Sequence, residues 1–208
     1  MLIKHKDQRV GIFIDAQNLY HCAKNLYGAK VNFAQVVKDA LANRSLIRAI
    51  AYVITTESGD EKNFFDALTK AGIETKTKDL QIFAGGQKKA DWDVGLAVDA
   101  IKMAPKLDTV IIVSGDGDFV PLVEYLKMNE GCQVEAVCFG KSTSAKLIET
   151  VDGFTDLDEM TSGLQNGDLV VIAGRPSMGK TALVVNIAEH VAIKTDKPVL
   201  IFSMEMPG

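Results

Sequence analysis

The 208-residue sequence lacks the features that mark membrane-spanning, secreted or disulfide-rich proteins. No apolar run approaches the roughly 20 residues of a membrane span, and residues 1–10 contain no apolar signal-peptide core. The three cysteines, Cys22, Cys132 and Cys138, form neither a disulfide framework nor a CxxC metal motif. We therefore expect a protein of the reducing cytoplasm with no membrane partner.

The sequence also lacks a strong excess of one charge. Its net charge is −4, from 23 Lys and Arg against 27 Asp and Glu, which argues against a broad, non-specific nucleic-acid binder. Residues 1–152 carry 19 basic and 20 acidic side chains. Four of those acids fall in the site predicted below, so the rest of this segment is mildly basic. Such a distribution suits a metal site that faces a polyanion.

Short apolar runs alternate with helical patterns over the first three quarters of the chain. Strands without polar alternation, separated by helices, predict an α/β fold: a mostly parallel sheet sandwiched by helices, as in three-layer PIN-like and Rossmann-like domains. The expected strands are 10–14, 47–54, 80–83, 109–113 and 134–139. The expected helices are 17–26, 33–41, 61–71, 91–103, 119–128 and 144–150.

The pattern restarts after about residue 151, which predicts two domains, 1–152 and 153–208. Residues 168–173 and 199–202 are expected to be strands around a helix at 182–193, which makes a single C-terminal βαβ P-loop fragment. Two parallel strands cannot cover both of their own faces. We therefore expect this fragment to pack on the first domain, to associate with another chain, or to remain partly unfolded.

Acidic residues follow two of the predicted strands. Asp15 ends the first, and Asp116 and Asp118 follow the strand at 109–113; Asp93 lies in the first turn of a predicted helix. Working groups of open α/β sheets gather at the carboxyl ends of strands, and neighbouring strands lie about 5 Å apart. Carboxylates that close repel unless a divalent cation neutralises them, and oxygen-only ligands select Mg²⁺ or Mn²⁺.

Each of these acids also has an ordinary structural interpretation. Asp before a helix is commonly an N-cap, and Asp-Gly is commonly a turn. For Asp118 this structural role is as well supported as metal binding, whereas for Asp15 metal binding is favoured. Asp91 is expected to cap its helix. Asp99 lies six residues beyond Asp93, a rotation of about 240°, so it is expected to be peripheral.

Three motifs carry a resemblance to a known family. FIDAQNL at 13–19, KADWDVGLAVD at 89–99 and SGDGDF at 114–119 resemble, in order, the motifs of NYN domains (LabA-like relatives of PIN nucleases). The resemblance covers residues 8–152 and implies a Mg²⁺- or Mn²⁺-dependent endoribonuclease that acts on single-stranded or structured RNA. It implies Asp15, Asp93, Asp116 and Asp118 as the acidic, metal-binding set, and Asn18 as a residue that orients substrate or a metal-bound water.

The family also contains members without proven activity, so a catalytically weak RNA- or protein-binding regulatory module is the alternative. Lys88, Lys89 and Lys141 lie in or next to predicted loops, where lysines can hold phosphates. For any one of them the sequence favours a solvated loop.

The segment GRPSMGKT at 174–181 matches the P-loop pattern GxxxxGK[ST] between a predicted strand and a predicted helix. Backbone N–H groups of such a loop cradle phosphates, which makes ATP the expected ligand. The expected nucleotide-binding residues of the loop are Gly174, Ser177, Gly179, Lys180 and Thr181.

Residues 153–208 closely resemble the start of the motor domain of bacterial DnaB-type replicative helicases. The resemblance implies that Glu205 activates the attacking water. No Walker B acid or arginine finger follows in these 208 residues, so ATP turnover and helicase work are not expected. A third hypothesis is therefore a nucleotide-binding element that associates with a helicase or with its own copies as a homo-oligomer.

Overall fold

The computed structural model describes residues 4–55, 62–79, 81–82, 88–89 and 92–161, together with Val185 and Glu189. The chain divides into two compact units, 1–163 and 164–208. In the second unit, Val185 and Glu189 are helical and exposed, within the helix expected at 182–193. The remaining predictions for that unit lie outside the described residues, namely Gly174, Ser177, Gly179, Lys180, Thr181 and Glu205.

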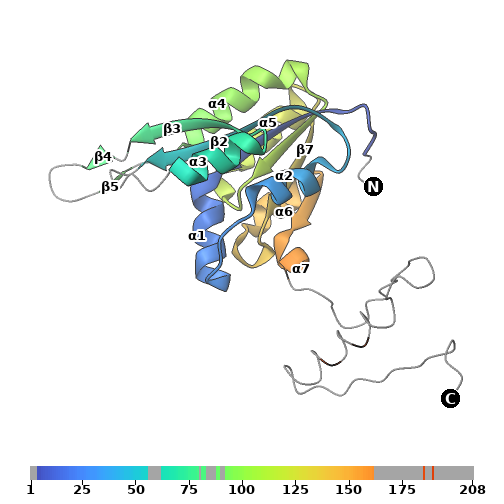
Figure 1. Ribbon diagram of the computed structural model, residues 1–208. Helices are drawn as coiled ribbons and strands as arrows, with labels where there is room; N and C mark the ends of the chain where they lie inside the picture. The colour runs from blue at the N-terminus through green and yellow to red at the C-terminus, as the bar shows by residue number, and fades with distance from the viewer. Residues whose placement is uncertain are drawn as a thin grey trace, which may run out of the picture. The chain divides into compact units, whose positions relative to one another are not determined.

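A six-stranded sheet forms the centre of the first unit, in the order β3-β2-β1-β6-β7-β8 (Figure 1). Every neighbouring pair in this sheet is parallel, which confirms the predicted α/β fold with its mostly parallel sheet. The strands are β1 (Arg9–Asp15), β2 (Ser45–Thr55), β3 (Glu74–Asp79), β6 (Thr109–Val113), β7 (Gln133–Cys138) and β8 (Gly153–Asp156). The short strands β4 (Gln81–Ile82) and β5 (Lys88–Lys89) pair separately and antiparallel.

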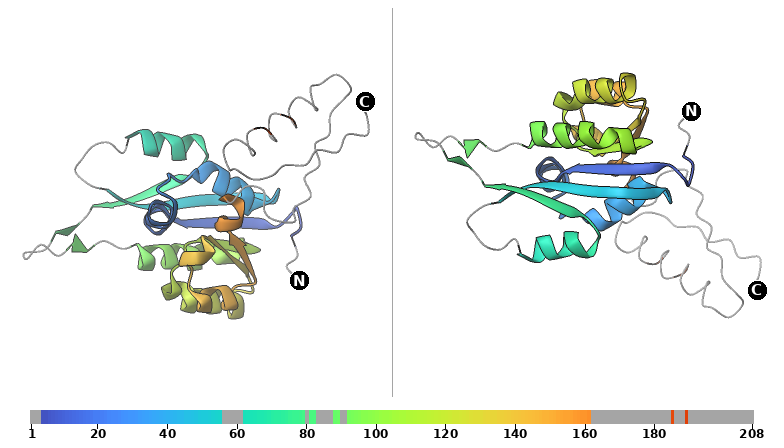
Figure 2. Two further views of the ribbon diagram at one scale, coloured as in Figure 1. Left: turned by 90° about the horizontal axis from the view of Figure 1, so that it is seen from below. Right: turned by 90° about the horizontal axis from the view of Figure 1, so that it is seen from above.

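Helices cover both faces of the sheet. Figure 2 shows α2 and α3 on one face and α4, α5 and α6 on the other. The helices are α1 (Ala16–Tyr27), α2 (Phe33–Leu41), α3 (Lys62–Lys70), α4 (Asp93–Met103), α5 (Val120–Met128), α6 (Ala145–Thr150) and α7 (Leu157–Thr161), with 3₁₀ turns η1 (Ala104–Lys106), η2 (Gly117–Phe119) and η3 (Gly140–Ser142). None of the helices in the described part of the chain is long and apolar enough to cross a bilayer.

Two apolar cores lie between these layers. One unites β1 with α1, α2 and α3 through residues such as Ile12, Leu19 and Leu68. The other unites the opposite face with α4, α5 and α6 through residues such as Leu96 and Val123. Because β1 and β6 are buried on both faces, they read as continuous apolar runs in the sequence.

Two strands of the sheet were not predicted. The edge strand β3 is polar (ETKTKD), and its residues 74–78 are exposed or half-buried, so it carries no apolar run. The other, β8, pairs with β7 and is followed by α7, so residues 153–161 belong to the first unit, beyond the boundary expected at 152. Leu80 and Phe83, the ends of an expected strand, lie outside the described residues.

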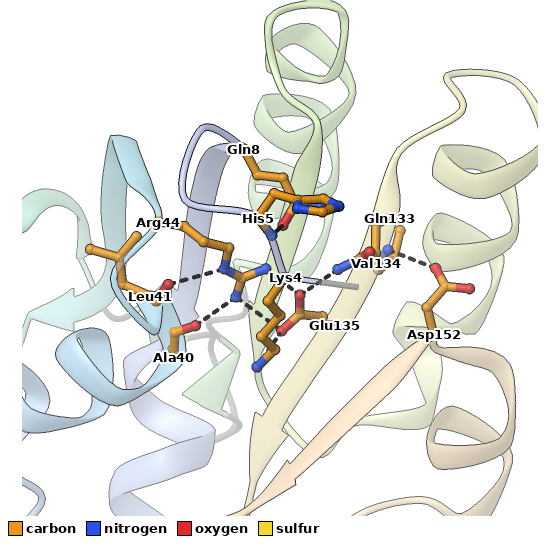
Figure 3. A network of polar contacts seen from close by, with 10 residues as sticks. All are labelled: Lys4, His5, Gln8, Ala40, Leu41, Arg44, Gln133, Val134, Glu135 and Asp152. Carbon is orange, nitrogen blue, oxygen red and sulfur yellow. Dashed lines mark hydrogen bonds and ion pairs between the residues drawn. The ribbon is translucent and has the colours of Figure 1, made fainter. Parts of the chain in front are cut away.

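A buried ion pair lies between α2 and β7 (Figure 3). Arg44, just before β2, binds both carboxylate oxygens of Glu135, and the two side chains are 0% and 2% exposed. The guanidinium also donates to the last carbonyls of α2, at Ala40 (2.8 Å) and Leu41 (3.0 Å). Glu135 is further matched by the Gln133 amide (2.7 Å) and by the Lys4 ammonium (3.4 Å). Each buried charge therefore has its partners.

Removing one half of this pair should destabilise the fold strongly. We expect Arg44→Met to lower the free energy of unfolding by about 3–5 kcal/mol, because Glu135 would stay buried without its main counter-charge. The double variant Arg44→Met/Glu135→Leu should regain most of that loss. Urea denaturation followed by fluorescence of the single tryptophan, Trp92, measures both.

The matched control is Arg9→Met, which breaks the pair between Arg9 and Asp108. Those side chains are 48% and 42% exposed. We expect a much smaller loss there, because water and salt screen an exposed pair. Equal losses at the two arginines would contradict the importance of the buried pair.

Candidate active site

The candidate site lies where β1 and β6 end side by side. Ile14 of β1 pairs with Val113 of β6, so the next residues, Asp15 and Ser114, are neighbours at the carboxyl edge of the sheet. The Ser114 hydroxyl donates to Asp15 Oδ2 (3.3 Å) and accepts from the Asp116 N–H (3.2 Å). Because β1 and β6 are neighbours, Asp15 and Asp116 lie at the same edge of the sheet.

Asp15 performs the capping role and also faces the site. Its Oδ1 accepts from the Asn18 N–H (3.0 Å), which caps α1. Burial raises the pKa of the Asp15 carboxyl, and the nearby Asp116 charge raises it further, against the hydrogen bonds from Asn18 and Ser114. Within the described residues, the groups that donate to the Asp15 carboxylate are neutral, so an ionised Asp15 keeps its charge available to a cation.

A pocket of about 400 Å³ opens beside Asp15. It is lined by acids from three separate segments: Asp15 at the end of β1, Asp93 at the start of α4, and Asp116 after β6. The structure thus brings together three of the four predicted acids. The other lining residues are Gln17, Asn18, His21, Cys22, Asn25, Tyr52, Ile54 and Trp92.

Trp92 fixes the start of α4, and with it the position of Asp93. Its indole N–H donates to the Val53 carbonyl (3.1 Å), and its ring lies 5.5 Å from that of Tyr52. The indole also covers Gly95, where an added Cβ would lie 2.4 Å from a ring carbon, so only glycine fits there. Asp91, the expected cap of this helix, lies outside the described residues.

Asn18 ties α1 to the loop that follows β6. Its side-chain oxygen accepts from the Gly115 N–H (3.2 Å) and from the Cys22 thiol (3.7 Å). The structure therefore gives this oxygen an internal role, and the contact with substrate or water that the family resemblance implies for Asn18 stays a prediction. Its position in the pocket wall agrees with the expectation that it belongs to the site.

Asp118 does not join the other three acids. It is exposed, its N–H donates to Asp116 Oδ1 (2.9 Å), and it is absent from the lining of the pocket. The reason is local: Asp116 precedes the 3₁₀ turn η2 and caps it, whereas Asp118 lies within the turn and is exposed. Among the described residues, no three His, Cys, Asp or Glu side chains form a group that could hold a metal ion. The structure therefore does not assemble the predicted four-acid set.

Asp99 is peripheral, as expected from its helical spacing. Its carboxylate accepts from the Tyr52 hydroxyl (2.7 Å) and from the Lys76 ammonium (2.6 Å). Although burial opposes ionisation, these two donors and the Lys76 charge hold the pKa of Asp99 below its usual value. Burial and the bond to Asp99 raise the pKa of Tyr52, so that phenol stays protonated.

The polar wall formed by α1 was missed in the sequence. Gln17, His21 and Asn25 are spaced by four residues and therefore lie on one side of the helix that Asp15 begins. That spacing was a signal available in the sequence. Tyr52 and Ile54 carried none, because their place beside the acids depends on the pairing of β2 with β1.

Comparison with known proteins identifies the family. Residues 9–158 match the NYN domain model, which covers most of the chain. The chain belongs to the NYN domain family. It therefore contains a nuclease-type domain. A crystal structure of a protein of unknown function from Vibrio parahaemolyticus is 32% identical, with a TM-score of 0.69; the match covers 76% of this chain and 98% of that one.

A second match follows the NYN domain. Residues 150–208 match the DnaB-like helicase C terminal domain. Replicative helicases of Haemophilus influenzae (DnaB, 58% identity over 56 residues) and Bacillus subtilis (DnaC, 61% over 54 residues) align with 27% and 26% of this chain. The chain spans 12% of the length of each helicase, so a fragment of that domain follows the NYN domain.

Substitution at Asp15 separates its two roles. Asn caps helices as well as Asp does and carries no charge, so we expect Asp15→Asn to raise the melting temperature at pH 7 in metal-free buffer. The folded state raises the pKa of Asp15, so its ionisation costs stability as pH rises through that pKa, and the advantage of Asn should shrink on acidification.

Asp15→Ala removes the cap together with the charge and serves as the control. It should be about 1 kcal/mol less stable than Asp15→Asn. Melting curves of the three proteins between neutral and acidic pH measure both effects. An Asn variant less stable than the wild type at pH 7 would contradict the electrostatic part of this interpretation.

Proposed function

We propose that the NYN domain of this chain is a divalent-metal-dependent endoribonuclease that hydrolyses phosphodiester bonds of RNA. The observation that carries the proposal is the convergence of Asp15, Asp93 and Asp116, from three distant segments, on one pocket at the carboxyl edge of the sheet. These negative charges repel a polyanionic substrate unless a cation is bound between the carboxylates and the substrate.

The residues present fit Mg²⁺ or Mn²⁺. The pocket offers carboxylate oxygens, and the described lining contains one imidazole and one thiol, too few for a zinc site. Mg²⁺ keeps several waters and is commonly bound through one or two carboxylates, so a three-acid cluster is not required. Asp15 and Asp116 would hold the ion, since the Asp116 carboxylate lies close enough to raise the pKa of Asp15.

When bound, such an ion polarises the phosphodiester and lowers the pKa of water. The protein's own residues do the positioning. Ser114 fixes the Asp15 carboxylate, and Asn18 holds α1 against Gly115 so that the pocket keeps its shape. The Asp93 carboxylate, which also lines the pocket and follows Trp92 at the start of α4, can accept a proton from the attacking water. The Gln17 and Asn25 amides are suited to a ribose 2′-hydroxyl.

Cleavage of a short, end-labelled single-stranded RNA with Mn²⁺ tests this function. We expect Asp116→Asn and Asp15→Asn each to reduce the rate by about 100-fold or more, because both remove charge from the metal and substrate site. Asp66→Asn, on the exposed side of α3, is the control and should cleave like the wild type. Cleavage that survives both site substitutions, or that persists in a chelator, would refute the proposal.

RNA binding without cleavage by the wild type would instead support the regulatory module. For the C-terminal fragment we propose ATP binding by the loop 174–181. ATP with Mg²⁺ should then raise the melting temperature, and Lys180→Ala should abolish that rise because it removes the cation that contacts the phosphates. An equal rise in the Lys180→Ala variant would rule out this loop.

A further inference from the structure

The outward side of α1 carries two exposed tyrosines. Tyr20 is 42% exposed and Tyr27 is 40% exposed. They are seven residues apart, which is close to two helical turns, so both rings lie on the same side of the helix about 10 Å apart along its axis. Solvent-facing helix sides are normally polar, and exposed tyrosines in contact with cations are typical of binding surfaces.

An ammonium group lies over each of these rings. Lys24 Nζ is 5.9 Å from the centre of the Tyr20 ring, and Lys141 Nζ is 5.4 Å from the centre of the Tyr27 ring. Lys141 comes from the turn η3 that follows β7, and it also donates to the Tyr27 hydroxyl (3.3 Å). Each tyrosine ring of α1 is therefore covered by a lysine, one from α1 itself and the other from η3.

His21 connects these rings to the acidic pocket. Its imidazole meets the Tyr20 ring edge-on, with centroids 5.6 Å apart and planes at 72°. It also lines the pocket, and among the described lining residues it is the one side chain able to carry a positive charge. The surface formed by Tyr20, His21, Lys24, Tyr27 and Lys141, which we call the aromatic ridge, thus begins at the wall of the pocket.

We propose that the aromatic ridge binds single-stranded RNA beside the pocket, with bases stacked on Tyr20 and Tyr27 and phosphates held by Lys24 and Lys141. Stacking on aromatic rings flanked by cations is the general means of holding single strands without sequence preference. A base that takes the place of the ammonium on a ring leaves the flexible lysine next to its phosphate. The His21 imidazole then faces the phosphate nearest the acids.

The ridge also selects the form of the nucleic acid. Bases in a duplex are paired and stacked on each other, so they cannot offer a face to a tyrosine. The strand-cleaving role of the neighbouring pocket rests on the proposed function, whereas binding by the ridge does not need a metal. The two can therefore be tested separately on the full chain.

Fluorescence anisotropy of a labelled mixed-sequence single-stranded RNA, measured in a chelator so that no cleavage occurs, tests the ridge. We expect Tyr20→Ala to weaken binding about tenfold. Lys24→Gln should weaken binding severalfold and reduce the slope of log affinity against log salt concentration by roughly the amount expected for one phosphate contact. Tyr125→Ala and Lys146→Gln, on α5 and α6 of the other face, are the matched controls. A duplex of the same sequence should bind weakly and be insensitive to Tyr20→Ala.

Four outcomes would refute RNA binding by the aromatic ridge. The first two are no binding of the RNA by the wild type and equal losses of affinity in Tyr20→Ala and Tyr125→Ala. The other two are equal salt dependence of binding in Lys24→Gln and the wild type, and duplex binding that depends on Tyr20. If the protein cleaves RNA but binds it independently of Tyr20, the proposed function is supported and binding by the ridge is refuted. If the protein binds RNA through Tyr20 without cleaving it, the proposed function is refuted and binding by the ridge is supported.

Discussion

The parallel pairing of β1 with β6 is the constraint on which the rest of the site depends. From β1 the chain continues to β2 and β3 on one side of the sheet, and β6 leads to β7 and β8 on the other. At such a switch point the connections leave toward opposite faces, and a crevice remains at the carboxyl ends of the two strands. Asp15 and Asp116 are 101 positions apart in the chain and meet because their strands are neighbours there.

Buried carboxylates near the two edges of the sheet differ in how their charge is compensated. Near the amino edge, Glu135 is surrounded by Arg44, Gln133 and Lys4, so its charge is neutralised within the fold. At the carboxyl edge, the donors to Asp15 from the part of the chain that the structure describes are neutral, and a second carboxylate, Asp116, raises its pKa. The first arrangement stabilises the fold and the second costs stability. The difference in charge compensation between Asp15 and Glu135 is therefore what marks the carboxyl edge as the candidate site.

Most of the fold and three of the four acids could be predicted because burial leaves a direct mark on sequence. The runs VGIFI and TVIIV are apolar throughout because both faces of β1 and β6 are covered, and the polar residues that end them had to lie at the sheet edge. The edge strand β3 carries no such mark, since its residues alternate between polar types. Asp118 has the same sequence signal as Asp116, but Asp116 caps the 3₁₀ turn and Asp118 lies within it. The place of Tyr52 and Trp92 depends on packing between distant segments, which spacing does not record.

Residues 150–158 satisfy both family models at once. The structure uses them to complete the NYN sheet: β8 pairs with β7, Asp156 accepts from the Gly140 N–H (2.8 Å), and Leu157 is buried in the core. Asp158 accepts from the Lys141 N–H (2.9 Å) and from the Tyr27 hydroxyl, so the same segment supports the end of α1. The sequence that the helicases share with this chain therefore begins inside the NYN fold rather than in a linker. A change in this overlap acts first on β7, η3 and α1, which are the elements that carry Lys141 and Tyr27.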